Sequence, residues 1–174
     1  MKLPEPFTKD NKLINVVIET PRGSHNKYAY NPEGDYFELR KILPFGTLFP
    51  FDFGFVPGTL AEDGQPLDAL VLAEFPSFPG CVIQCRCLGV IKAEQKEKGR
   101  KYRNDRIISV PCESLTYKEF KSVNYVSQHD LDEVIRFFEY YNEMANKKFK
   151  FLGLGNKSTA FKLIRKNITD SITK

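Results

Sequence analysis

The chain has 174 residues, of which 41% are hydrophobic and 28% charged. This composition is typical of a globular protein and excludes a disordered chain, and the length predicts a single domain over residues 1–174. The net charge is +4, but residues 146–174 hold eight Lys and Arg against one acid, so residues 1–145 are mildly acidic. A mildly acidic body argues against a nucleic-acid partner.

The sequence predicts neither membrane attachment nor export. Its apolar runs fall short of the roughly 18–20 residues of a membrane span. The N-terminal residues MKLPEPFTKDNK lack the apolar centre of a secretion signal. We therefore expect no membrane partner.

The first two-thirds of the sequence has strand patterns separated by turns. Runs that are β-branched or alternate in hydrophobicity predict five strands, over residues 13–20, 35–42, 69–74, 81–93 and 106–111. Asn-Pro-Glu-Gly-Asp at 31–35 predicts a turn that joins the first two strands as a hairpin. The charged residues 94–105 predict an exposed hairpin loop between the last two strands.

The last third of the sequence changes to a helical period. Apolar residues from Leu131 to Ala145 recur at helical spacing, after an N-cap at Ser127 or Asp130. A shorter helix is predicted over 161–168, within a basic C-terminal tail that starts at about residue 156. These elements predict a mainly β (α+β) fold, a five-stranded OB-like closed barrel with one or two C-terminal helices packed on it.

The four cysteines favour free thiols over a metal site or disulfides. They fall at residues 81, 85, 87 and 112, and the two histidines are distant from them in sequence. A zinc site would need a fourth ligand close by. Free thiols are typical of a reducing compartment, so we expect a cytoplasmic protein.

The most informative segment is a short acidic loop. Asp63 and Asp68 lie five residues apart in Asp-Gly-Gln-Pro-Leu-Asp, which is bent by glycine and proline and precedes a strand. A bent loop can turn both carboxylates toward one hard cation, whose preferred ligands are oxygens. The same pattern also occurs in ordinary solvated turns, so the spacing alone leaves both interpretations open.

This loop and its surroundings resemble the soluble family I inorganic pyrophosphatases. The matching segments are Glu19 in IETP, Lys27-Tyr28 in NKYAY, the block FPFDFGF from Phe49 to Phe55, the acidic loop, PGCVIQCRCLGV, RIISVP and FFEYYN. Their order and approximate spacing hold from about Val16 to Gly153. The resemblance therefore covers nearly the whole predicted domain.

The resemblance implies hydrolysis of pyrophosphate to two phosphates, with Mg²⁺ as cofactor and a metal-activated water. It also implies a homo-oligomer, which is commonly a hexamer in bacterial members. Carried over by position, the catalytic residues are Asp63, Asp68 and Gln65. The metal ligands are Asp63, Asp68 and Glu19, joined by Asp105 and Glu94 through a shift of one residue, with Glu97 as a substitute for Glu94. The substrate-binding residues are Lys27, Lys41 or its neighbour Arg40, Arg106 and Tyr141.

Several positions depart from the family pattern, which predicts a divergent member with a partly eroded active site. The departures are Ala29, Lys41, Phe49, Phe53, Gln65, Gln95, Asn104 and Asn142. Gln65 replaces an aspartate, and a carboxamide can position a water but cannot take its proton. Two functions stay open, an impaired Mg²⁺-dependent pyrophosphatase and a catalytically inactive pseudoenzyme that binds pyrophosphate or nucleotide phosphates.

Packing alone also explains some of these residues. Phe49, Phe51, Phe53 and Phe55 alternate as the aromatic filling of a strand-like segment. Tyr141 falls at an apolar helical position, so core packing accounts for it without catalysis.

Overall fold

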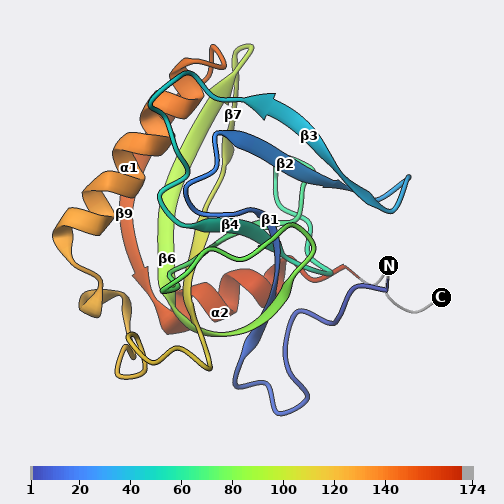
Figure 1. Ribbon diagram of the computed structural model, residues 1–174, viewed down its shortest axis with the longest axis vertical. Helices are drawn as coiled ribbons and strands as arrows, with labels where there is room; N and C mark the ends of the chain where they lie inside the picture. The colour runs from blue at the N-terminus through green and yellow to red at the C-terminus, as the bar shows by residue number, and fades with distance from the viewer. Residues whose placement is uncertain (1, 170–174) are drawn as a thin grey trace.

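The structure is a computed structural model that describes residues 2–169 (Figure 1). In chain order its elements are β1 (Ile14–Thr20), β2 (Asn26–Asn31), β3 (Tyr36–Ile42), β4 (Asp52–Val56), β5 (Leu67–Val71), β6 (Val82–Glu97), β7 (Arg100–Arg103), β8 (Arg106–Pro111), η1 (Val123–Tyr125), α1 (Gln128–Glu143), β9 (Lys148–Asn156) and α2 (Lys157–Lys166). The end of the basic tail, residues 170–174, lies outside the described residues.

Five strands close into a ring, which confirms the predicted OB-like barrel. β1 pairs with β4 on one side and β6 on the other, and β4, β5, β8 and β6 complete the circle. Only the β5–β8 pair among these is parallel. Closure leaves none of the five strands with a free edge along the ring. The long strand β6 also carries β7 and β9 (Figure 1).

The membership of the barrel differs from the prediction at one strand. The predicted strand at 35–42 forms as β3, but it pairs with β2 in a separate two-stranded sheet, and β4 takes its place in the ring. The predicted turn is present, since the side chain of Asn31 accepts hydrogen bonds from the amides of Glu33 and Gly34. The predicted hairpin partner is wrong, because the turn joins β3 to β2, which the sequence did not predict, and not to β1. β3 is too polar for a closed barrel, whereas all five residues of β4 are buried.

Both C-terminal helices are present, and a strand that the sequence did not predict lies between them. Ser127 caps α1 by accepting a hydrogen bond from the Asp130 amide, and Asn156 caps α2 by accepting one from Thr159. Residues 148–156 form β9, which lies antiparallel to β6. Its alternation of Lys with Phe and Leu suits a half-buried strand.

The barrel strands face two apolar clusters, one under each helix. On β5, Leu70 packs with Phe137 and Phe138 of α1, whereas Ala69 and Val71 pack in the cluster that includes Ile164 of α2. Strand alternation therefore sends odd and even residues toward different helices. The four predicted aromatic residues at 49, 51, 53 and 55 are all buried, which confirms their structural role.

β1 and β4 approach each other most closely at Gly54. A Cβ atom at this position would overlap the backbone carbonyl of Val17 on the neighbouring strand. The next ladder position is irregular, since Ile18 pairs with Gly54 but Thr20 pairs with Phe53. Glu19 is therefore the extra residue of a β-bulge, a feature that redirects a side chain.

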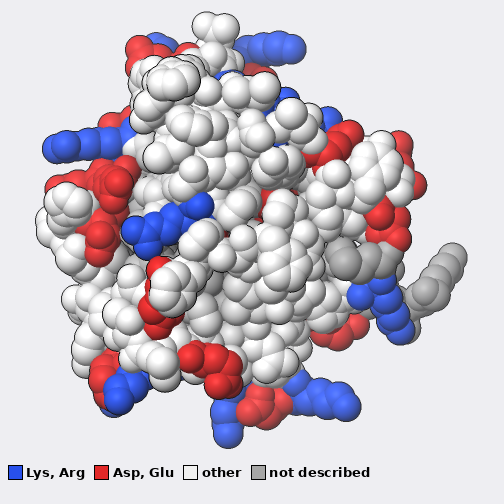
Figure 2. Space-filling model, in the orientation of Figure 1, with Lys and Arg blue, Asp and Glu red and all other residues white. Residues whose placement is uncertain are grey.

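The surface and the cysteines agree with a globular protein. The four cysteines are free thiols, and those at 85 and 87 are buried. Among the described residues, no helix combines the length and apolarity needed to cross a membrane. In the view of Figure 2, acidic and basic side chains are interspersed mainly around the rim, and the centre is largely uncharged.

Candidate active site

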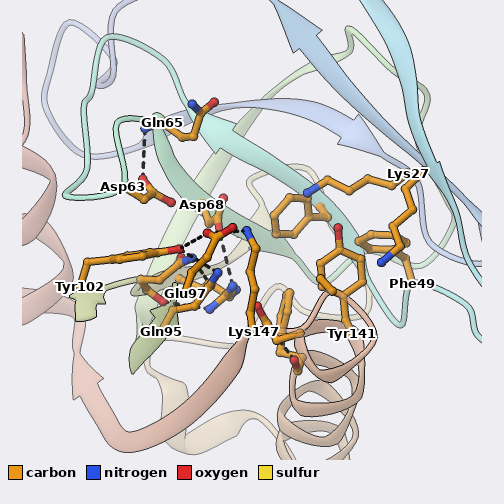
Figure 3. Close-up of a pocket in the computed structure, with 17 residues that line it drawn as sticks. Lys27, Phe49, Asp63, Gln65, Asp68, Gln95, Glu97, Tyr102, Tyr141 and Lys147 are labelled. Carbon is orange, nitrogen blue, oxygen red and sulfur yellow. Dashed lines mark hydrogen bonds and ion pairs between the residues drawn. The ribbon is translucent and has the colours of Figure 1, made fainter. Parts of the chain in front are cut away.

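Two adjoining cavities of about 390 and 440 Å³ lie between the barrel, the β2–β3 hairpin and the end of α1. The residues that line both are Lys27, Lys41, Phe53, Gln65, Asp68 and Tyr141. All but Phe53 were predicted as site residues. The fold thus brings together in one place side chains from β2, β3, β5, α1 and the acidic loop (Figure 3).

The acidic loop is held in a tight turn. The amide of Ala61 donates to the carbonyl of Gln65, and the amide of Gln65 donates to the Asp63 carboxylate at 3.1 Å. Gly64 has a φ of 81°, which a side chain would disfavour. The turn sets Asp63 and Gln65 on the wall of the first cavity, where Asp68 also lies.

Asp68 and Arg106 form an ion pair on the wall of the first cavity. Asp68 lies on β5 and Arg106 on the neighbouring strand β8, with 3.6 Å between carboxylate and guanidinium. Burial raises the pKa of Asp68 and lowers that of Arg106, and the attraction between the two charges opposes both shifts. The guanidinium also lies 3.9 Å from the ring centroid of Phe138 and donates to the carbonyl of Asn104.

The carboxylate of Glu19 faces the second cavity. The bulge in β1 brings it to the amide of Tyr30, from which it accepts a hydrogen bond of 2.8 Å. Burial raises the pKa of Glu19 to about 7, and the charge of Lys27 opposes this shift. A cation close to Glu19 would favour its ionised form and so lower this raised pKa.

The lysines of the β2–β3 hairpin face Tyr141 across the cavities. The Lys27 amine lies 5.2 Å from the ring centroid of Phe53 and 5.4 Å from that of Tyr141. The Lys41 amine lies 5.0 Å from the ring centroid of Tyr141. Arg40, the alternative to Lys41, lines only the second cavity and forms an ion pair with Glu38. The geometry therefore favours Lys41 over Arg40 as the residue between the two cavities.

The structure does not bring Asp105 and Glu94 into these cavities. Asp105 accepts hydrogen bonds from Arg103 and from the amide of Ala93, and it lines a separate cavity behind the acidic loop. Glu94 forms an ion pair with Lys101. Glu94 lies on β6, where neighbouring residues point to opposite sides, so a shift of one residue turns it away from the site. Asp105 lies between β7 and β8, where the contacts with Arg103 and Ala93 hold its carboxylate outside the two cavities. Because neither residue lines the two cavities, we leave both out of the metal ligands proposed for this site.

A hydrogen-bonded row of side chains lines the first cavity instead. Asn104 donates to Gln95 at 2.8 Å, Gln95 donates to the Tyr102 hydroxyl at 2.9 Å, and this hydroxyl donates to Glu97 at 3.3 Å. Glu97 also pairs with Lys147 at 3.0 Å. The predicted exposed loop at 94–105 is therefore partly a cavity wall, and Gln95 is only 4% exposed.

Tyr102 and Lys147 were not predicted as site residues. Both occur among charged residues, which are typical of a solvated surface. The one available signal was the alternation from Ile91 through Gln95 to Glu97, which would have extended the strand to residue 97. The strand prediction stopped at residue 93 because the residues that follow are polar.

The carboxylates of the cavities do not form a closed ligand cage. In the part of the chain that the structure describes, the only group of three or more ligand atoms within 4.8 Å of one another is His129, Asp130 and Glu133, on the outside of α1. Asp63, Asp68 and Glu19 are spread more widely around the cavities. Such spacing leaves room for water or substrate oxygens between protein and cation.

Comparison with known proteins identifies the family. The inorganic pyrophosphatase profile matches residues 16–171. The inorganic pyrophosphatase of Synechocystis is 41% identical over 141 residues, which are 81% of each chain. The crystal structure of the Thermus thermophilus enzyme superposes with a TM-score of 0.87 at 33% identity, covering 96% of this chain and 95% of that one. The Helicobacter pylori enzyme gives a TM-score of 0.86 at 32% identity, covering 97% of both chains. This chain belongs to the inorganic pyrophosphatase family.

Proposed function

We propose that this protein hydrolyses pyrophosphate to two phosphates with Mg²⁺ as its cofactor. The observation that carries the proposal is that acidic and basic side chains line the same cavity. Asp63 and Asp68 supply anionic oxygens, and Lys27, Lys41 and Arg106 supply cations that suit phosphate oxygens. A diphosphate with its counter-cation matches such a mixed lining better than either ion alone.

Lys27, Lys41 and Arg106 bind and orient the substrate. The two lysines come from a hairpin that projects from the barrel, while the Arg106 side chain is buried and fixed by its neighbours. A fixed positive charge stabilises the negative charge that develops on phosphate oxygens during bond cleavage. Tyr141 places its hydroxyl on the same cavity and supplies a further hydrogen-bond donor.

The donor chemistry around Asp68 fits Mg²⁺. Among the described residues, the only ion pair of this partly exposed carboxylate is the one with Arg106 at 3.6 Å, beyond good hydrogen-bond length. Mg²⁺ is typically held by one or two carboxylates, waters and phosphate oxygens, which suits Asp63 and Asp68 as its protein ligands, with Glu19 on the adjoining cavity. When bound, Mg²⁺ neutralises phosphate charge and lowers the pKa of water.

Gln65 lies where a general base is expected. It is exposed on the acidic loop and lines the same cavity as Asp63 and Asp68, and its side-chain amide donates to the carbonyl of Gly64 at 3.3 Å. It holds a water by hydrogen bonds but accepts no proton from it. We therefore propose that turnover is slower than a carboxylate at this position would permit.

The test of the proposed function is phosphate release from pyrophosphate with and without Mg²⁺. We expect release with Mg²⁺ and none above the spontaneous rate after chelation with EDTA. Pyrophosphate bound tightly but not cleaved would contradict hydrolysis and support the pseudoenzyme. Nucleoside diphosphates and triphosphates, assayed in parallel, show whether the cavity accepts organic phosphates.

Replacing Gln65 with aspartate is expected to raise pyrophosphate turnover by about 10²-fold. A general base contributes about 10²–10⁴ in rate, and the exposed loop accepts aspartate without strain in the core. The measurement is kcat for phosphate release at saturating Mg²⁺. Gln128→Asp, at an exposed position on α1 away from the cavities, is the matched control and should leave kcat unchanged. An unchanged or lower kcat for Gln65→Asp would remove Gln65 as the cause of slow turnover.

We propose the cytoplasm as the compartment and a homo-oligomer as the assembly. The four free thiols support the first, because reducing compartments preserve thiols. The family membership supports the second, and light scattering of the purified protein measures the oligomeric state directly.

A further inference from the structure

The end of α1 reaches the cavity through Lys147. Asn142, in the last turn of α1, is buried, and its side-chain amide donates to the carbonyl of Phe138 within the helix. The chain then turns back at Asn146, whose φ is 55°, and the Lys147 amide donates to the carbonyl of Asn142. This turn directs the Lys147 side chain onto the cavity wall, toward Glu97 (Figure 3).

Glu97 is held from the opposite side by the β6–β7 hairpin. One oxygen, Oε2, accepts from the Tyr102 hydroxyl and pairs with the Lys147 amine at 3.0 Å. A carboxylate only accepts hydrogen bonds, so the Tyr102 hydroxyl must donate to it and accept in turn from Gln95. The hydrogen bonds from Asn104 to Gln95, on to Tyr102 and then to Glu97 therefore fix the position of the Glu97 carboxylate.

The Glu97–Lys147 pair faces the cavity but is not sealed off from solvent. The Lys147 side chain is 30% exposed and that of Glu97 35%. Ion pairs at this exposure contribute little net free energy, so either partner changes contacts readily when a stronger one is offered. Both residues line the same cavity as Asp63 and Asp68.

A metal–diphosphate complex offers a better partner to both residues at once. Its phosphate oxygens attract Lys147, and its cation attracts Glu97. The free diphosphate anion satisfies only Lys147 and leaves Glu97 next to a like charge. Electrostatic complementarity of this kind acts mainly on the choice of ligand, because the wrong ligand meets repulsion.

We propose that Glu97 and Lys147 form a clasp that selects metal-complexed diphosphate over the free anion. Lys147 binds a phosphate oxygen, and Glu97 exchanges its lysine partner for the cation side of the complex. Glu97 is the specificity-determining residue, and Tyr102 positions it. The proposal rests on the proposed function only in assuming that the cavity takes diphosphate.

The test is calorimetric binding of imidodiphosphate, which resists hydrolysis, in the presence of Mg²⁺ and of EDTA. The wild-type protein should bind the Mg²⁺ form at least tenfold more tightly than the free anion. In Glu97→Gln this ratio should fall about tenfold, mainly because the free anion binds more tightly once the repulsion is gone. In Lys147→Gln the affinity for both forms should fall about tenfold, since one phosphate contact is lost.

Matched controls separate the clasp from a general change in charge. Glu143→Gln and Lys148→Gln remove the same charges at exposed positions that do not line the cavities. They should leave both affinities unchanged, and thermal melts confirm that all four variants fold. An unchanged ratio in Glu97→Gln, or an equal change in Glu143→Gln, would overturn the clasp.

Binding and turnover distinguish this inference from the proposed function. If the ratio of the two affinities depends on Glu97 but the protein releases no phosphate, the clasp is supported and hydrolysis is contradicted. Phosphate release together with an affinity ratio that Glu97→Gln leaves unchanged would support hydrolysis and contradict the clasp. Failure of the wild-type protein to prefer the Mg²⁺ form would overturn the clasp regardless of turnover.

Discussion

Asp68→Asn is expected to lower pyrophosphate turnover by about 10³-fold. The carboxylate lies on β5 beside Arg106, with its side chain 21% exposed, and is one of the two acidic groups proposed to hold Mg²⁺. Loss of charge stabilisation by the cation would cost about 4 kcal/mol in the transition state, and each 1.36 kcal/mol is a factor of ten. The measurement is kcat for phosphate release at saturating Mg²⁺, together with the Mg²⁺ affinity.

The control for this variant is Glu33→Gln, which removes one negative charge from the exposed turn between β2 and β3. It should retain the wild-type kcat. Asp68→Asn also leaves the Arg106 guanidinium buried without its anion, so its melting temperature must be measured beside its activity. A folded Asp68→Asn protein that keeps kcat within threefold of wild type would exclude Asp68 from the site.

Gly54→Ala is expected to destabilise the fold by about 3 kcal/mol or more. The added methyl group would overlap the carbonyl of Val17, and both atoms belong to the backbone of paired strands. Overpacking costs 1–3 kcal/mol even where side chains can shift, and here β1 and β4 would have to separate. Urea unfolding followed by circular dichroism measures the change.

Gly34→Ala is the matched control for Gly54→Ala. Its methyl group would overlap the ring of Tyr36, which is 51% exposed and can swing toward solvent at the loss of one exposed hydrogen bond from Asn31 to its hydroxyl. Its cost should therefore stay within about 0.5 kcal/mol. Equal losses of stability in the two variants would show that the close approach of β1 and β4 does not require a glycine at position 54.

The barrel could be predicted because four of its strands are apolar or β-branched over most of their length. The fifth, β4, was harder to recognise, because its Phe-Gly-Phe core suits a turn or packed loop as well as a strand. β3 was assigned to the barrel on its alternation, but alternation marks one apolar face and does not identify the partner strand. β9 was missed because its lysines resemble a solvated tail.

The site was predictable where one loop or one strand carries it. Asp63, Gln65 and Asp68 occupy a short segment, so their meeting follows from local geometry. Asp105 lies in the short connection between β7 and β8, and its spacing in the sequence did not reveal that Arg103 and Ala93 would hold it outside the cavities. Lys147 reaches the cavity only through the turn at Asn146, and neither periodicity nor spacing reveals the direction in which such a turn points.

The closed ring has a consequence for how this protein folds. The Asp68–Arg106 pair depends on the parallel contact of β5 with β8, and β6 must be laid down along β8 and joined to β1 before the circle shuts. The β1–β6 and β5–β8 pairs join distant parts of the chain, and contacts of this kind form slowly during folding. Because Asp68 and Arg106 come from two such distant strands, they meet only where the β5–β8 pair has formed.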